Sequence, residues 1–196
     1  VKVVIFASNG GNFSSGGDVH DIIGPLTKMS MKELLNFTRM TGDLVKAIVN
    51  CGRPVIAAID GYCWGAGLQI ALGADFRIAS SRANLSIMES KMGLTSDMAG
   101  SLTLREIMPK DQAMGLSMCA TQLDAKTALH HGLITEINDK PLEAAIELSK
   151  QFAQTSPDAI AAIKHIYNRY WTAPRWKLLA YETYSQVRIL VGKNFM

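Results

Sequence analysis

Hydrophobic positions along the chain follow two patterns. Short runs rich in Val and Ile have the length and composition of buried strands; they cover residues 2–7, 54–59, 76–79, 85–87 and 133–137. Between the first two runs, residues 31–49 repeat apolar side chains at helical spacing, and Gly52 and Pro54 mark the helix end. Strands that alternate with helices in this way predict an α/β fold.

The second half of the chain has a mostly helical pattern. Helices are predicted over residues 98–108, 111–118, 125–131, 142–155, 157–170 and 174–191. Asp124 and Ser156 stand at N-cap positions, with Pro157 at the first helical position after Ser156. Because no repeat or low-complexity linker divides the chain, we expect one α/β core, residues 1–135, followed by a helical C-terminal region, residues 136–196.

The composition is that of an ordinary globular domain, with 48% hydrophobic and 19% charged residues. The formal net charge is only +3, and the basic residues are scattered along the chain. A nucleic-acid-binding domain normally concentrates its basic residues on one face. We therefore expect no nucleic-acid partner.

The cysteines and the longest apolar stretch indicate in which compartment the protein is expected. Cys51, Cys63 and Cys119 are odd in number and widely spaced, without a CxxC pair or a Cys/His cluster. This pattern favours a reducing, cytoplasmic compartment and no metal site. Charged side chains, an amide and several glycines interrupt the apolar residues 54–79, which argues against a membrane span.

Two turns with small residues follow predicted strands. The first, NFSSGGD at residues 12–18, contains Gly16 and Gly17; the second, DGYCWGAGLQIALGAD at residues 60–75, enters a helix through Gly65, Ala66 and Gly67. Small side chains at a helix start let a developing negative charge approach unpaired backbone N–H groups. Either turn alone is explained by tight turning or close packing. Together they predict an oxyanion hole.

These turns resemble the crotonase, or enoyl-CoA hydratase/isomerase, superfamily in order and spacing. The segments that follow, FRIAS at 76–80 and SIMESKMGLTSD at 86–97, extend the resemblance, as do ALHHGLI at 128–134 and SPDA at 156–159. The resemblance implies a crotonase-like spiral of strands and helices with a helical C-terminal region. Relatives usually have a segment before Val1 and a tail beyond Met196, so it also implies that this sequence is a portion of a longer protein.

Carboxylate and amide side chains then suggest a proton-transfer site. Glu89 matches the family's catalytic glutamate, and Gln69 falls where the hydratases carry a second glutamate. Because an amide cannot exchange a proton as a carboxylate does, Gln69 favours isomerisation over hydration. Asp97, eight residues after Glu89, resembles the paired acid of dienoyl-CoA isomerases, but it fits equally well as the N-cap of the helix predicted from residue 98.

By the same resemblance, the Gly17 and Ala66 N–H groups hold a thioester oxygen. The residues implied in binding the acyl-CoA are Ser15, Gly17, Asp18, Val19, His20, Trp64, Gly65 and Ala66. His20 fits equally a solvated turn, and Trp64 a core position. No cofactor is implied beyond the coenzyme A carried by the substrate. The ten methionines fit adaptable packing best; the alternative expected for Met88 and Met92, beside Glu89, is that they shape an acyl pocket.

We therefore expect an enoyl-CoA hydratase/isomerase-type enzyme of fatty-acid or related acyl-CoA metabolism, with Glu89 moving protons. The alternative is an acyl-CoA-binding crotonase-fold protein with little or no turnover. Crotonase relatives are commonly trimers or dimers of trimers. The C-terminal region carries many apolar side chains, so we expect it to pack on the core and on neighbouring subunits of a homotrimer or hexamer.

Overall fold

A parallel four-stranded sheet lies at the centre of the computed structural model, which describes residues 2–192 apart from the side chains of residues 19, 20, 22 and 23. Its strands, in spatial order, are β1 (Val4–Phe6), β2 (Val55–Ile59), β4 (Phe76–Ala79) and β7 (Glu136–Ile137). Ile5 pairs with Ile56, and Ala57 pairs with Arg77. All three pairings are parallel, as expected when helices connect successive strands.

A smaller three-stranded sheet lies beside the first. It contains β3 (Tyr62–Trp64), β5 (Asn84–Ser86) and β6 (Leu123–Asp124), with β3 parallel to β5 and β5 antiparallel to β6. β3 follows β2 after a two-residue turn in which Gly61 has φ +58°. The chain therefore leaves the central sheet at the turn that the sequence singled out.

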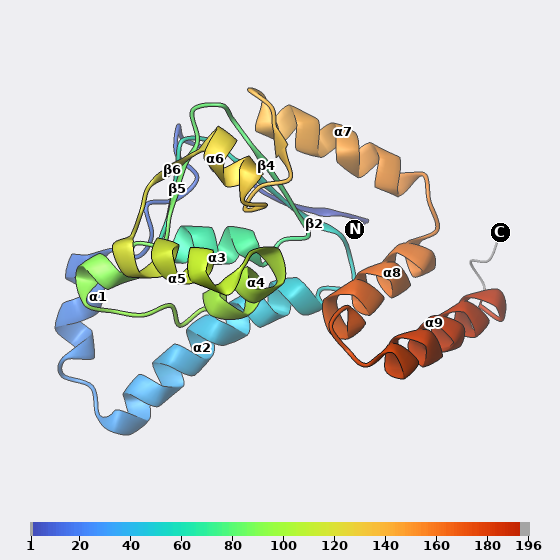
Figure 1. Cartoon of the computed structure of the whole chain (residues 1–196), viewed down its shortest axis with the longest axis horizontal. Helices are drawn as coiled ribbons and strands as arrows, with labels where there is room; N and C mark the ends of the chain where they lie inside the picture. The colour runs from blue at the N-terminus through green and yellow to red at the C-terminus, as the bar shows by residue number, and fades with distance from the viewer. Residues whose placement is uncertain (1, 193–196) are drawn as a thin grey trace.

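Helices surround these sheets (Figure 1). They are α1 (Val19–Leu26), α2 (Met31–Asn50), α3 (Ala66–Leu72), α4 (Gly100–Ile107), α5 (Lys110–Cys119), α6 (Ala125–His130), α7 (Pro141–Ala153), α8 (Pro157–Tyr170) and α9 (Arg175–Leu190), with a 3-10 helix, η1, at Glu89–Met92. The predicted caps are confirmed: Asp124 Oδ1 accepts from the Thr127 N–H at 2.8 Å, and Ser156 caps α8. The α/β class is confirmed as well.

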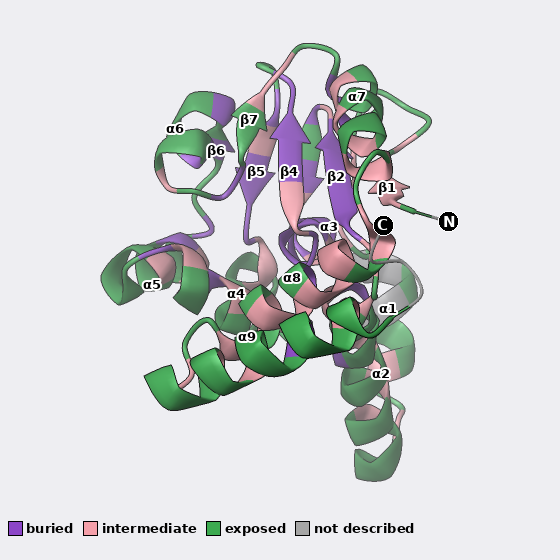
Figure 2. Cartoon of the chain, turned by 90° about the vertical axis from the view of Figure 1, so that its right-hand side faces the viewer, coloured by how far each residue is buried: buried purple, intermediate pink, exposed green. Residues whose placement is uncertain are grey.

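The central sheet is buried on both faces, as Figure 2 shows for β2 and β4. Val55, Ala57 and Ile59 of β2 join one apolar cluster with α2 and α3. Ile56 and Ala58 point to the opposite face and pack with Ala145 of α7. This alternation is the two-residue period of a strand, and helix cover on both sides explains the continuous apolar run.

The helices α8 and α9 form an arm that stands apart from the core in Figure 1. At its base the buried Lys164 reaches from α8 to Asp75, with 2.9 Å between Nζ and Oδ2, and donates to the carbonyls of Ile48 and Arg53. Asp75 also accepts from the Val55 N–H at 2.7 Å. One carboxylate thus joins the start of β2 to the arm, and the carbonyls satisfy the rest of the buried ammonium group.

Candidate active site

The two predicted turns lie against each other. Ser14 N–H donates to the Tyr62 carbonyl, and the Ser14 carbonyl accepts from Trp64 N–H, both at 2.9 Å. The first turn therefore runs as a short parallel extension of β3. A methyl group added to Gly16, whose φ is +101°, would lie 3.2 Å from the Trp64 carbonyl oxygen and 3.7 Å from the Ala66 nitrogen.

Small residues are required at this crossing. Gly65 has φ +52°, a region that side chains rarely adopt. A Cβ atom on Gly67 would lie 2.5 Å from the Cβ of Ser14. The sequence Gly65-Ala66-Gly67 therefore allows α3 to start directly against the first turn.

Two backbone N–H groups at the crossing have no acceptor among the described residues. Gly65 donates its N–H to the Ser86 carbonyl at 2.9 Å. Ala66 opens α3 without a side-chain cap, and within residues 2–192 no oxygen accepts a hydrogen bond from the N–H of Ala66 or of Gly17. A pair of free N–H groups on adjoining turns is the donor set that an oxyanion hole needs.

The carboxylate of Glu89 lies beside the second turn. Glu89 opens η1 just after β5, and a methyl group on Gly65 would be 3.7 Å from Glu89 Oε1. Oε1 accepts a hydrogen bond from Gln69 Nε2 at 2.5 Å. Oε2 is buried, and none of the described residues donates to it. A buried carboxylate oxygen without a partner is costly, so it needs an explanation other than packing.

The orientation of the Gln69 side-chain amide is fixed by its hydrogen bonds. Its side chain is 1% exposed, and its Oε1 accepts from the N–H groups of Met98 at 3.1 Å and Gly100 at 3.3 Å. Two N–H donors can only face the amide oxygen, so the Nε2 end must face Glu89. A Cβ on Gly100 would lie 2.8 Å from Gln69 Oε1, so the glycine makes room for this amide.

A cavity of about 630 Å³ adjoins Glu89. It lies between the segment after η1, α4 and α5, and most of its wall is apolar. Lining residues include Ile87, Glu89, Leu94, Leu104, Met108 and Met114. Met88 and Met92, the methionines expected to shape the pocket, do not line it. The volume falls within the range of ordinary small-molecule sites.

Comparison with known proteins identifies this arrangement. The enoyl-CoA hydratase/isomerase family model matches residues 1–189. The chain belongs to this family. The crystal structure of an enoyl-CoA hydratase from Polaromonas sp. JS666 matches with a TM-score of 0.92 and 26% identity, over 99% of this chain and 76% of that chain. A Streptomyces coelicolor A3(2) protein provisionally assigned as an enoyl-CoA hydratase gives a TM-score of 0.95 and 32% identity, over 100% and 72%. The crotonase fold is confirmed.

A curated relative extends the comparison to sequence. Carnitinyl-CoA dehydratase of Escherichia coli (strain K12) is 33% identical over 150 residues, which are 76% of this chain and 56% of that protein. The chain therefore spans little more than half the length of this curated relative. No helix within residues 2–192 is long and apolar enough to cross a membrane.

Asp97 does not join the other predicted family residues. Its Oδ2 accepts from Thr41 Oγ1 of α2 at 3.2 Å, and it does not line the cavity. The N-cap interpretation of Asp97 is wrong, because α4 starts at Gly100 after Ala99, whose φ is 61°, without a side-chain cap. Gln69 Oε1 takes the N–H groups of Met98 and Gly100 instead, so no cap is needed from Asp97.

The remaining predicted contacts lie around the first turn. Ser15 and Gly17 are exposed, and Asp18 Oδ1 accepts from the Asp21 N–H at 3.3 Å. Val19 and His20 open α1, so His20 is in a helix rather than in a turn, and the side chains of both lie outside the described part of the chain. Trp64 is half-buried and donates from Nε1 to Asn84 Oδ1 at 2.7 Å.

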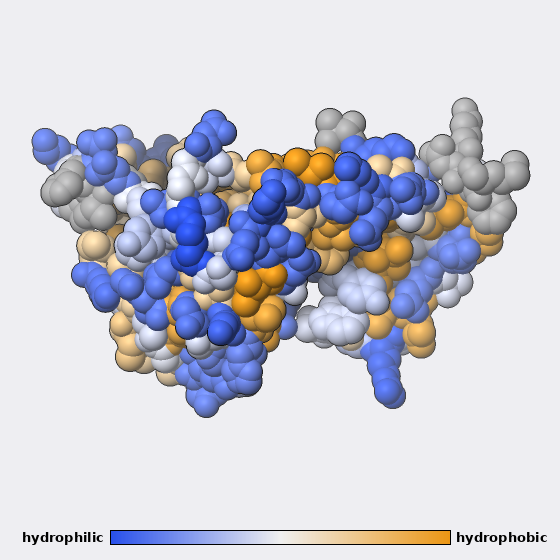
Figure 3. Space-filling view, turned by 90° about the horizontal axis from the view of Figure 1, so that it is seen from above, coloured by the Kyte–Doolittle hydropathy of each residue, from blue (hydrophilic) through white to orange (hydrophobic). Residues whose placement is uncertain are grey.

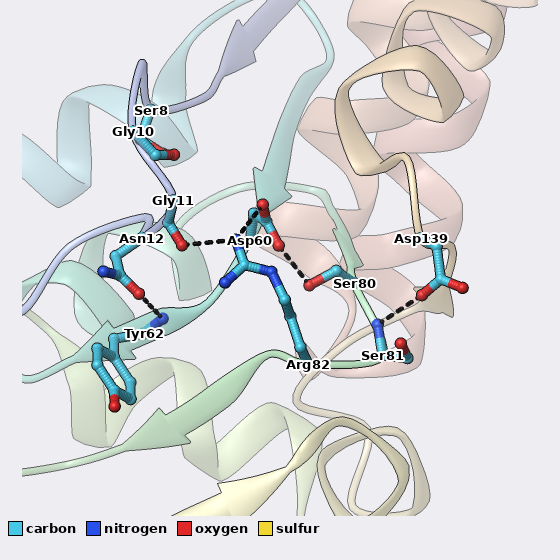
Figure 4. Close-up of polar contacts among 10 residues, drawn as sticks. All are labelled: Ser8, Gly10, Gly11, Asn12, Asp60, Tyr62, Ser80, Ser81, Arg82 and Asp139. Carbon is cyan, nitrogen blue, oxygen red and sulfur yellow. Dashed lines mark hydrogen bonds and ion pairs between the residues drawn. The ribbon is translucent and has the colours of Figure 1, made fainter.

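A polar network that the sequence did not predict lies behind the first turn (Figure 4). Arg82 Nη2 donates to the Gly11 carbonyl at 2.7 Å and to Asp60 Oδ2 at 2.5 Å, while Asp60 Oδ1 accepts from Ser80 Oγ. Asn12 Oδ1 accepts from the Tyr62 N–H at 3.0 Å. The hydrogen bond from Arg82 holds the pKa of Asp60 below its ordinary value. No local motif signals these long-range contacts.

The side chains of His131, His165 and Cys63 are engaged in packing or hydrogen bonds. His131 Nδ1 lies 2.9 Å from Gln112 Oε1, and the His165 ring lies tilted against Tyr181 with ring centroids 4.9 Å apart. Burial raises the pKa of the Cys63 thiol, which makes it a poor nucleophile. In the described part of the chain, no group of three His, Cys, Asp or Glu side chains is placed to hold a metal ion.

Proposed function

We propose that this protein isomerises unsaturated acyl-CoA thioesters through an enolate, with Glu89 as the single proton carrier. One observation carries the proposal: Glu89 Oε1 is engaged by the Gln69 amide, while Oε2 is buried and has no donor among the described residues. A carboxylate held at one oxygen presents the other to a substrate proton. No cofactor is needed beyond the coenzyme A of the substrate.

The proposed reaction has two proton transfers. Glu89 Oε2 removes a proton from the α carbon of a 3-enoyl thioester, and the electron pair of the broken C–H bond moves to the thioester oxygen. The N–H groups of Gly17 and Ala66 donate to this oxygen; one such donor typically contributes about 2.7–4 kcal/mol to transition-state stabilisation. Glu89 then returns the proton to the γ carbon, so the double bond moves next to the thioester.

Hydration is disfavoured by the chemistry of Gln69. Adding water to an enoyl thioester requires one group that activates the water and one that protonates the α carbon. The Gln69 amide has no proton to release at neutral pH, and its oxygen is occupied by the Met98 and Gly100 N–H groups. Asp97, whose resemblance to a paired acid was one of two interpretations, accepts a hydrogen bond from Thr41 Oγ1.

The second candidate is an acyl-CoA-binding protein with little or no turnover. Gln69 also favours it, because a family position for a carboxylate holds an amide. A spectroscopic assay distinguishes the two candidates: trans-3-enoyl-, trans-2-enoyl- and dienoyl-CoA are incubated with the protein while the absorbance of the conjugated thioester is followed. Binding without any spectral change would favour the binding protein.

Product analysis tests the isomerisation itself. Mass spectrometry after incubation with trans-3-enoyl-CoA and trans-2-enoyl-CoA separates a product of unchanged mass from a product that has gained water. We expect the first from the 3-enoyl substrate and little of the second. Efficient hydration without isomerisation would overturn the proposal.

We also propose that the protein forms a homotrimer or hexamer through α8 and α9. Trp176 is 68% exposed and Leu179 60% exposed, and α9 packs mainly on α8. Seen from above, the right-hand part of the molecule, where Figure 1 places this arm, carries hydrophobic patches between hydrophilic residues (Figure 3). Exposed aromatic and aliphatic side chains of this kind mark protein contacts. Light scattering would refute the assembly if the purified protein were a monomer at working concentration.

A further inference from the structure

The cavity beside Glu89 extends away from the free N–H groups. Glu89 lines it, but no residue of the two turns does, neither Gly17 nor Ala66. If the thioester oxygen lies at the turns and the reacting carbons lie at Glu89, the part of the substrate that enters the cavity is the acyl chain beyond those carbons. The coenzyme A portion leaves on the other side of the thioester.

The wall of this cavity is apolar where its residues are buried and carries cationic side chains where they are exposed. Ile87, Leu104 and Met108 are buried at the inner part, while the exposed Arg105 and Lys110 contribute to the same lining from α4 and the start of α5. Glu89 is the one acidic residue in the lining. The cations therefore have no acidic neighbour in the wall other than the proposed base.

Neither cation is neutralised elsewhere. None of the ion pairs between residues of the described chain includes Arg105 or Lys110. No side-chain hydrogen bond to a described residue is formed by either of them, unlike Arg82, which is held by Asp60 and Gly11. Two unpaired cations beside an apolar cavity attract an anion and repel a cationic group.

We infer that the acyl chain of the substrate ends in an anionic group, a carboxylate, which Arg105 and Lys110 bind at the outer end of the cavity. The inference rests on the proposed function for the placement of the thioester. Arg105 offers a planar pair of donors that suits a carboxylate, and Lys110 adds a point charge. A phosphate of coenzyme A that folded back over α5 is the other source of the same anionic chemistry.

Calorimetric binding of saturated thioesters tests this inference without requiring turnover. The probes are adipoyl-CoA and suberoyl-CoA, their monomethyl esters, and the matching pantetheine thioesters, which lack the phosphates. We expect the carboxylates to bind about two- to fivefold more tightly than the esters, within the range for an exposed charge pair. This preference should also hold in the pantetheine series.

Two single variants, Arg105→Gln and Lys110→Gln, assign the preference to the cavity wall. Each should lose most of the difference between acid and ester, while ester binding stays near that of the wild type. Lys126→Gln removes an exposed positive charge from α6, outside the cavity, and should leave the difference unchanged.

Three outcomes would overturn the inference. Equal binding of acid and ester to the wild type would show that no anionic end is selected. An acid preference that Arg105→Gln and Lys110→Gln both leave intact would place the selecting group elsewhere. Variants that weaken every CoA thioester but no pantetheine thioester would assign the cations to the phosphates. Carboxylate selection in a protein that never turns over enoyl substrates would instead defeat the proposed isomerisation and leave the binding site standing.

Discussion

Gln69 donates from Nε2 to Oε1 of Glu89 at 2.5 Å, and both residues reach this contact from different elements, the interior of α3 and the start of η1. The amide cannot flip its oxygen and nitrogen, because the N–H groups of Met98 and Gly100 bind the oxygen from the other side. The contact therefore orients the carboxylate and leaves its Oε2 for chemistry. A glutamate at position 69 would change the charge at this contact and leave its shape almost the same.

Replacing the proposed base tests the role of Glu89. Glu89→Gln should lower kcat for isomerisation by about 10²–10⁴-fold, the usual contribution of a general base. Binding of a saturated acyl-CoA should change little, because the amide keeps the shape of the side chain. Steady-state kinetics and calorimetry on the same preparation provide both values. Turnover close to that of the wild type would remove Glu89 from the mechanism.

Restoring a second carboxylate tests whether Gln69 limits hydration. Gln69→Glu should raise kcat/KM for hydration of a short trans-2-enoyl-CoA, because the Met98 and Gly100 N–H groups can still hold one oxygen at position 69. Two carboxylates about 4 Å apart repel by roughly 4 kcal/mol at an effective dielectric constant of 20, which favours retention of one proton by the pair.

A matched variant separates charge from shape at the same position. Gln69→Met removes the donor to Glu89 without adding an acid, and it should lower isomerisation without any gain in hydration. Thermal unfolding of both variants checks that the fold is retained. If the wild type already hydrates efficiently and Gln69→Glu gains nothing, the steering role of Gln69 is wrong.

The close contact at Gly100 can be tested through stability. Gly100→Ala would place a methyl group 2.8 Å from Gln69 Oε1, so we expect a loss of about 1–3 kcal/mol in the free energy of unfolding, together with lower turnover. Gly115→Ala in α5 has open space around the added methyl group and should be neutral or stabilising. Urea unfolding compares the two; equal effects would show that no such contact exists.

The network behind the first turn predicts a positioning role for Arg82. Arg82→Gln removes the hydrogen bonds to Gly11 and Asp60, and the turn that carries Gly17 loses its support. We expect kcat to fall by about tenfold or more, since a misplaced oxyanion donor loses most of its effect, with a smaller change in KM. Arg39→Gln on the exposed face of α2 is the control. Equal kinetics for both variants would contradict this role.

His165 gives a pH dependence of known sign. Burial, followed by the charges of Arg169 and Arg188, lowers the pKa of His165 below 6.5. The folded state therefore binds this proton less readily than the unfolded chain, so the stabilising contribution is complete above pH 6.5 and is lost as the pH falls below that value. Thermal unfolding should show this loss in the wild type and less of it in His165→Phe. Parallel pH profiles for the two proteins would refute it.

Much of the fold could be predicted because its elements have local signals. The helices α2 and α4–α9 begin and end within two residues of the predicted ranges, since caps and apolar spacing are encoded nearby. The helix α1 was missed because Gly24 and Pro25 interrupt its apolar residues. The strand predicted from residue 133 pairs only at Glu136–Ile137, where β4 provides a neighbour.

The candidate site likewise has residues that could be predicted from the sequence and contacts that could not. Gly17, Ala66 and Glu89 were selected because their motifs resemble those of the crotonase family, and the structure brings these segments together. The amide orientation of Gln69 could not, because it depends on N–H groups 29 and 31 residues away. The same distant contact explains the error on Asp97: a side chain from α3 satisfies the start of α4, and no local cap was there to be found.

The position of Asp75 has a mechanical consequence. This carboxylate receives Lys164 from the arm, and three residues before it ends the seven-residue helix α3, whose other end presents Ala66. A rigid rod of two turns thus links the root of the arm to the donor of the proposed oxyanion hole. We therefore expect that a displacement of α8 by a neighbouring molecule would be felt at Ala66, so that anchoring the end of the chain would also steady the proposed donor.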